Sequence, residues 1–178
     1  MQKHFKKYRI QYKGLAAGLH TFTYDIDETF FALFPTSEIT QGKVLVNIDM
    51  LAKTTGLQLD FNLTGTVMIG CDICIDEFEM PVNYKSVLHV RFSEKSSDIS
   101  DVDDVLLLAH EEHEVDVSQH IFEFIHLSLP LKRVHPKNEN GKSTCNKEMI
   151  QQLKKYKIAT ETGNDTDPRW DDLKKLLN

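Results

Sequence analysis

The sequence contains only three cysteines and no long apolar run. Three is a small and odd number for a disulfide framework, which indicates a reducing compartment such as the cytosol. Because no run of about 18 apolar residues is present, we expect no membrane-spanning helix. The basic start, residues 1–9, lacks the apolar block of a signal peptide. These absences together predict a cytoplasmic protein.

Catalytic motifs are missing as well. The sequence has no G-x-S-x-G motif, no phosphate-cradling glycine loop and no dinucleotide-binding fingerprint. His110-Glu-Glu-His113 lacks the spacing that puts two imidazoles on one helix face around a metal ion. We therefore expect no enzymatic activity and no small-molecule substrate. A metal-dependent hydrolase is a weaker alternative, which convergent carboxylates at a metal would favour.

The formal net charge is −6, and the charges are unevenly distributed. Residues 94–116 carry nine acids against one base, which is typical of a solvated, flexible acidic loop. Residues 132–157 carry eight bases against two acids. A net acidic protein is a poor general binder of polyanions, but a basic face on an acidic body remains compatible with this pattern.

Alternating apolar residues predict a series of strands. The pattern covers residues 6–12, 20–26, 43–49, 57–69 and 84–92. Short connections between neighbouring strands favour antiparallel pairing, in a curved sheet or a partly closed barrel. In the longest strand, Gly65 predicts a bulge or bend.

Helical patterns dominate the last third of the chain. Residues 116–130 have an apolar stripe, a possible cap in Asp116 or Ser118, and Pro130 at the end. A short helix at 27–34 and helices at 147–156 and 167–177 complete the set. We expect an α+β fold with an antiparallel barrel-like β-sheet and helices packed from the C-terminal third. The predicted divisions are one domain at 1–157, a linker at 158–166 and a C-terminal helix at 167–178.

Cys71 and Cys74, in the motif C-D-I-C, are the strongest candidates for metal ligands. Two cysteines with two residues between them can bind one metal ion, because a tight turn brings both sulfurs together. His135 and Cys145 are candidates for the other half of a tetrahedral zinc site, which would have a structural role. The alternative is that the cysteines are small buried hydrophobes and that His135 is an ordinary loop residue.

Basic side chains surround the second half of this candidate site. Lys132, Arg133, Lys137 and Lys142 lie on or beside the 135–145 segment, where a bound metal would fix them for contact with phosphates. Aromatic residues that stack on single-stranded bases are absent from this segment. A lysine-rich surface without a partner is the alternative interpretation.

The order of several motifs resembles the YceD-like family of large ribosomal RNA subunit accumulation proteins. The similar blocks are C-D-I-C-I-D-E-F at 71–78, the acidic segment before V-D-V at 115–117, F-E-F-I-H-L-S-L-P-L at 122–131 and D-P-R-W-D-D-L-K-K-L-L at 167–177. Many family members carry two cysteine pairs. Here His135 takes the place of one cysteine of the second pair and Cys145 that of its partner, so four zinc ligands are retained.

This resemblance implies a bacterial, cytosolic and non-enzymatic protein of ribosome biogenesis. We expect it to bind ribosomal RNA or a large-subunit precursor, with Lys132, Arg133, Lys137 and Lys142 as the first phosphate contacts. The alternative is a protein-binding adaptor that docks a basic ribosomal protein through its acidic segment.

Overall fold

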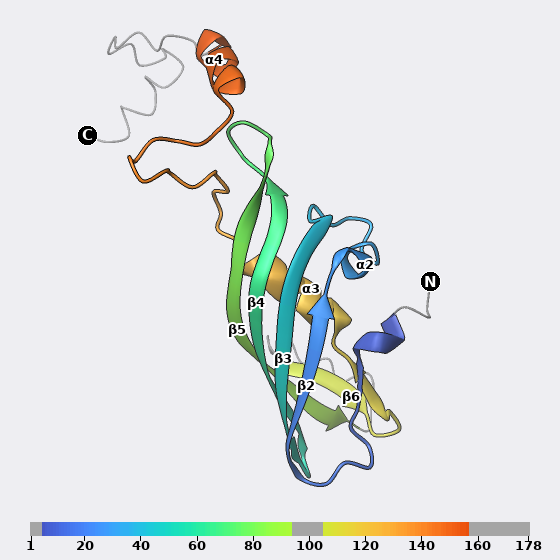
Figure 1. The fold of residues 1–178 in the computed structure, drawn as a ribbon. Helices are drawn as coiled ribbons and strands as arrows, with labels where there is room; N and C mark the ends of the chain where they lie inside the picture. The colour runs from blue at the N-terminus through green and yellow to red at the C-terminus, as the bar shows by residue number, and fades with distance from the viewer. Residues whose placement is uncertain (1–4, 94–104, 157–178) are drawn as a thin grey trace, which may run out of the picture.

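The computed structural model describes residues 5–93 and 105–156 and has an α+β fold (Figure 1). A five-stranded sheet consists of β2 (Gly18–Ile26), β3 (Gln41–Lys53), β4 (Gly56–Gly70), β5 (Glu77–Ser93) and β6 (Val105–Ala109). β1 (Arg9–Gln11) pairs with β7 (Glu114–Asp116) in a second, small sheet. The helical segments are η1 (Lys6–Tyr8), α2 (Glu28–Phe31), α3 (Ser118–Leu127) and α4 (Lys147–Tyr156).

The larger sheet is open, so the expected barrel-like closure is wrong. Its strand order is β2-β3-β4-β5-β6, and β2 and β6 are the two edges. The first four strands are antiparallel neighbours, but β6 runs parallel to β5. A parallel neighbour needs a crossover connection instead of a hairpin, and strand periodicity does not reveal that choice. The sheet is therefore mixed.

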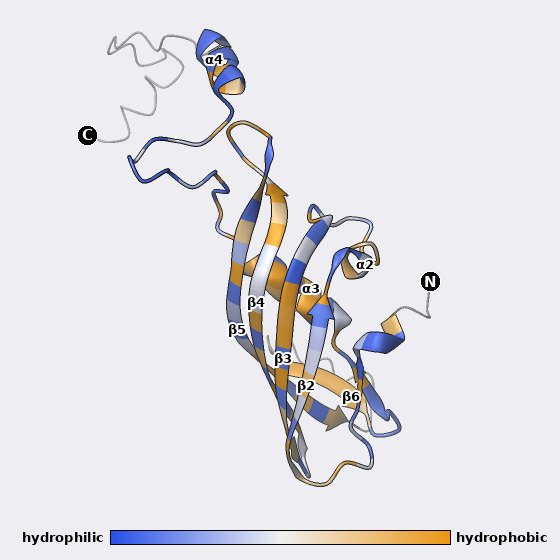
Figure 2. Ribbon diagram, viewed as in Figure 1, coloured by the Kyte–Doolittle hydropathy of each residue, from blue (hydrophilic) through white to orange (hydrophobic). Residues whose placement is uncertain are grey.

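Alternate residues of the long strands form one buried face. Val46, Ile48, Leu59 and Leu63 are completely buried, and their neighbours along the strands point to the opposite face. Figure 2 shows the resulting alternation of apolar and polar residues along β3 and β4. Because side chains alternate between the two faces of a strand, this pattern gives the sheet one core face and one solvent face.

Helix α3 lies across the core face of the sheet (Figure 1). The Phe124 ring contacts Phe61 of β4 and Tyr84 of β5, at centroid distances of 5.0 and 5.9 Å. The N-cap residue of α3 is Val117, which makes no side-chain cap hydrogen bond, so neither Asp116 nor Ser118 occupies the expected cap position. The Asp116 carboxylate, one residue earlier, accepts a hydrogen bond from the Ser118 backbone N–H at 2.9 Å. The chain thus crosses the sheet before it enters the segment that contains His135.

The acidic segment 94–116 contains more regular structure than its composition predicts. β6 and β7 both lie within it, and Arg9 of β1 forms ion pairs with Glu114 and Asp116. Main-chain hydrogen bonds to β5 and β1 therefore keep these two segments in strands despite the many acidic residues around them. Residues 94–104, the predicted linker and the predicted C-terminal helix lie outside the described residues. Within the described ranges, no helix has the length and apolar content needed to cross a membrane.

Gly65 does not produce the expected bulge. β4 pairs with β3 and with β5 in an unbroken register through this residue. A Cβ atom at Gly65 would lie 2.1 Å from the carbonyl oxygen of Lys43, far inside van der Waals contact. A glycine is thus required by the close approach of β3.

We predict that Gly65→Ala lowers the free energy of unfolding by about 2–3 kcal/mol, because the added methyl group forces β3 and β4 apart. Gly70→Ala in the same strand is the matched control, since its Cβ would meet its nearest atom at 3.7 Å. Urea unfolding of both variants measures the difference. Equal stability of the two variants would contradict the steric explanation.

Candidate metal centre

Cys71 and Cys74 lie in a tight turn between β4 and β5. The Cys71 N–H donates to the carbonyl oxygen of Asp76, and the Ile75 N–H donates to the carbonyl oxygen of Cys71, both at 2.9 Å. Ile75 has a φ of 67°, which is rare for a β-branched residue and turns the chain sharply. This geometry returns the chain toward β5 and leaves both cysteine side chains buried.

His135 and Cys145 are brought together by an antiparallel hairpin. Lys137 pairs with Ser143 in an isolated bridge, and the Thr144 hydroxyl donates to the Pro136 carbonyl oxygen at 2.7 Å. In such a register, the next facing pair on the same side lies two residues outward. That pair is His135 and Cys145, so their separation of ten positions follows from the size of the hairpin.

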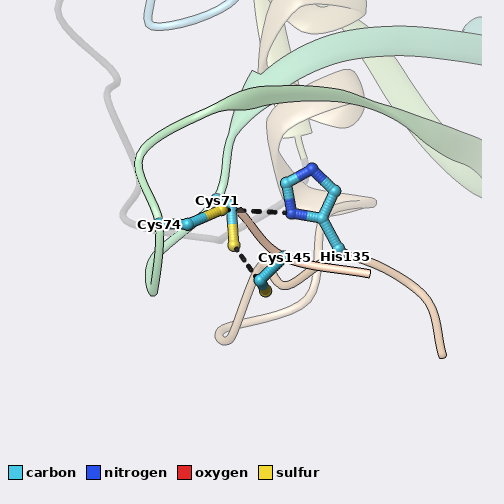
Figure 3. A group of neighbouring side chains, drawn as sticks. All are labelled: Cys71, Cys74, His135 and Cys145. Carbon is cyan, nitrogen blue, oxygen red and sulfur yellow. Dashed lines mark hydrogen bonds between the residues drawn. The ribbon is translucent and has the colours of Figure 1, made fainter. Parts of the chain in front are cut away.

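The four candidate ligands converge as predicted (Figure 3). The ligand atoms of Cys71, Cys74, His135 and Cys145 all lie within 4.8 Å of one another. The Sγ atoms of Cys71 and Cys145 are 3.8 Å apart, and Cys74 Sγ is 3.4 Å from His135 Nδ1. Tetrahedral zinc would place two sulfur ligands about 3.8 Å apart and a sulfur and a nitrogen about 3.5 Å apart. The spacing therefore fits a Cys₃His zinc site.

Two opposing effects determine the pKa of the Cys71 thiol. Burial raises this pKa, while hydrogen bonds from the backbone N–H groups of Cys74, Ile73 and His135 and from the His135 side chain lower it. The balance lowers the pKa from 9.0 to about 6, which favours the thiolate form of Cys71. Thiolate is the form that binds metal, and the same amide hydrogen bonds stabilise it.

The Cys74 thiol is shifted in the opposite direction. Burial is the largest cause of its raised pKa, and hydrogen bonds with Cys71 and Cys145 act in the same direction. Backbone N–H groups of Asn146 and Asp76 oppose the shift only in part. Binding of a divalent cation would displace the proton of Cys74, because the metal replaces it as the partner of the sulfur.

Arg133 and Asp72 hold the two halves of the site together without a metal. The Asp72 N–H donates to the Arg133 carbonyl oxygen at 2.8 Å, and the Arg133 N–H donates to the Asp72 carboxylate at 2.6 Å. The Arg133 guanidinium also forms ion pairs with Asp72 and with Glu38. Each partner lies beside a candidate ligand, so this contact positions His135 relative to Cys71.

A second polar contact lies on the other side of the centre. The Asn146 side-chain N–H donates to the Asp76 carboxylate at 3.0 Å. The Asn146 side-chain oxygen accepts hydrogen bonds from the N–H groups of Glu148 and Met149, in the first turn of α4. The start of α4 is thereby fixed next to Cys145. Neither this contact nor the one at Asp72 has a signal in the sequence, because both depend on the three-dimensional pairing of distant segments.

The predicted basic residues are arranged in two different ways. Lys132, Lys137 and Lys142 are exposed on the segment that carries His135 and on its hairpin. Among the described residues, none of these three lysines lies within ion-pair distance of a carboxylate. Arg133 differs, since its charge is engaged by Asp72 and Glu38. His110 and His113 are exposed in a turn after β6, apart from the Cys/His cluster.

Comparison with known proteins identified a matching family model. The family model described as "Large ribosomal RNA subunit accumulation protein YceD" matches residues 59–177, about two thirds of the chain. This range begins within β4 and includes all four candidate ligands and the basic hairpin. Neither the curated proteins nor the solved structures yielded a match to the chain.

We predict that the purified protein binds about one zinc ion per chain, and that a double Cys71→Ser, Cys74→Ser variant binds almost none, because two thiolate ligands are lost. A His110→Ala, His113→Ala double variant is the control and should retain the metal. Elemental analysis and thermal melting are the measurements. If the wild type holds no zinc and the cysteine variant melts at the same temperature, the metal centre is refuted.

We also predict that Asp72→Ala weakens zinc binding by about 10- to 100-fold, because it frees the segment that carries His135. Glu38→Ala is the matched control. It removes one exposed ion pair but keeps the Asp72–Arg133 contact, so its effect should be much smaller. Competition with a chromophoric chelator measures both affinities. Similar losses in the two variants would argue against a positioning role for Asp72.

Proposed function

The chain belongs to the YceD family of large ribosomal RNA subunit accumulation proteins, and from this premise we propose that it binds large-subunit ribosomal RNA or a precursor of that subunit. The family description gives the chain a role in ribosome biogenesis. The mode of action is our proposal: the protein holds or protects RNA and performs no catalysis. We further propose that it acts in the cytoplasm, where ribosomal precursors of bacteria are assembled.

One structural observation supports the RNA-binding proposal above others. Lys137 and Lys142 flank the tip of a short hairpin whose two ends carry His135 and Cys145. Asn138 orders the tip, since its side-chain oxygen accepts hydrogen bonds from the N–H groups of Asn140 and Lys142. Lysines on an ordered backbone lose less conformational freedom when they contact phosphates, which favours binding.

The metal site would stabilise the two ends of the hairpin that carries these lysines. When bound, zinc would supply structural cross-linking between the turn at 71–74 and the hairpin. Arg133 contributes by orienting the segment instead of presenting a free charge, because two carboxylates already neutralise it. We therefore assign the phosphate contacts of this segment to Lys132, Lys137 and Lys142.

The adaptor alternative depends on the acidic residues. Glu114 and Asp116 are partly neutralised by Arg9, which reduces the charge available for a basic protein partner. Glu111 and Glu112 remain exposed in the turn after β6. The two functions differ in how they respond to removal of these charges. A Glu111→Gln, Glu112→Gln variant should bind RNA more tightly, whereas an adaptor would lose its basic partner.

We predict that the wild-type protein enriches large-subunit ribosomal RNA in a pull-down, and that Lys137→Gln, Lys142→Gln reduces this enrichment. In salt titrations with a large-subunit RNA fragment, loss of two phosphate contacts should lower the slope of log K against log[salt] by about 1.5–2. RNA sequencing and fluorescence anisotropy are the measurements.

A Lys43→Gln, Lys85→Gln variant is the control for this experiment. It removes the same charge from two exposed lysines on the solvent face of the sheet. An equal loss in the two double variants would show that only net charge matters. Absence of large-subunit RNA and of its proteins from the wild-type pull-down would reject the proposed function itself.

A further inference from the structure

A second cationic site lies at the other end of β4 from the metal centre. A cleft of about 560 Å³ is formed where the β3–β4 hairpin meets β5, and Lys53, Gly56, His89 and Arg91 are among its lining residues. Gly56 is the first residue of β4 and Cys71 follows the last. Fifteen residues of strand span roughly 50 Å when extended, so this cleft is separate from the hairpin at 135–145.

The strand register places the cationic side chains on one face of the sheet. Lys53 pairs with Gly56, and Gly56 pairs with Arg91, so the three residues form one row across β3, β4 and β5. The adjacent row on the same face contains Gln58 and His89. Directly opposed residues lie on the same face, so Lys53 and Arg91 flank the position of Gly56.

Gly56 carries no side chain between these two cations. An added Cβ would lie 2.1 Å from the carbonyl oxygen of Val90, so the approach of β5 requires glycine at this position. The exposed side chains of Lys53 and Arg91 on its two sides both donate hydrogen bonds.

The charge of this cleft is not compensated within the described part of the chain. Neither Lys53 nor Arg91 forms an ion pair there, in contrast to Arg9 and Arg133. The described lining residues include no carboxylate. Asp60, on the same face of β4, accepts the side-chain N–H of Gln58 at 3.1 Å. Lys53, His89 and Arg91 thus remain as donors that face the cleft.

We infer that this cleft binds a phosphate group, with the Arg91 guanidinium and the Lys53 ammonium as its principal contacts. Arginine matches two phosphate oxygens in a planar fork, and lysine adds a point charge on the opposite side. The imidazole of His89 donates a further hydrogen bond. We assign the phosphate to the backbone of an RNA. Only this assignment of the source rests on the proposed function; the site itself stands on the cleft.

The test uses the full chain and two probes, a large-subunit RNA fragment and inorganic phosphate. Lys53→Gln, Arg91→Gln is compared with the Lys43→Gln, Lys85→Gln control, which removes equal charge from the same sheet face. We expect the cleft variant, and not the control, to lower the salt slope of RNA binding by about 1–2. Both variants change exposed side chains, and circular dichroism checks that both are folded.

The outcomes separate this inference from the proposed function. If the wild type binds RNA and the two variants lose affinity equally, or neither loses any, the cleft is not an RNA contact. Another outcome is that inorganic phosphate shifts the backbone amide resonances of residues 89 and 91 in the wild type and not in the cleft variant, while the salt slope of RNA binding is the same in both. In that case the phosphate site is confirmed and its assignment to RNA is wrong. If neither probe responds to the cleft variant, the inference is overturned even when the hairpin variant abolishes RNA binding.

Discussion

The contact between Asp72 and Arg133 is the interaction on which the arrangement of the candidate centre depends. It joins the turn that follows β4 to the segment that follows α3, two parts of the chain separated by β5, β6, β7 and α3. Both main-chain N–H groups take part, so the contact fixes position along the backbone as well as charge. If a metal alone brought the four side chains together, metal binding would include the full entropic cost of loop closure. Here a neutral and a charged hydrogen bond already hold the turn at 71–74 and the segment that carries His135 next to each other, which lowers that cost.

The large sheet separates the two partners of this contact along the chain. β4 and β5 are long, and α3 crosses their core face, so the chain leaves the centre at Cys74 and returns to it at Arg133 (Figure 1). Packing of Phe124 against Phe61 and Tyr84 determines where α3 lies on the sheet. A shift of the helix would move Arg133 away from Asp72, and with it His135. The aromatic packing of the core is therefore coupled to the geometry of the centre, and the core residue Phe78 also contacts the His135 ring directly, at a centroid distance of 4.6 Å.

Much of the fold and the four candidate ligands could be predicted from sequence, because each has a local signal. Apolar alternation identified β3 and β4, and the C-D-I-C spacing identified half of the centre. The parallel pairing of β6 could not be predicted, since strand periodicity contains no information about direction. Gly65 was misinterpreted for a related reason: a glycine indicates either a bulge or a close approach, and only the neighbouring strand decides. The engagement of Arg133 was equally hidden, because its partner Glu38 lies 95 positions away.

The positions of the charged residues say more about binding than the net charge of the protein does. The chain is acidic overall, yet among the described residues cations without an ion-pair partner occur near both ends of β4, on the hairpin and in the cleft beside Gly56. Attraction between a polyanion and a protein decays within about 8 Å at physiological ionic strength, so a net charge of −6 spread over the whole surface does not cancel a local cationic site. Two such sites near opposite ends of the sheet would bind a long polyanion more tightly than either alone, provided that the polyanion spans both. A folded RNA meets that requirement, whereas a single nucleotide does not, and this difference is why we regard RNA as the partner that uses both ends of the sheet.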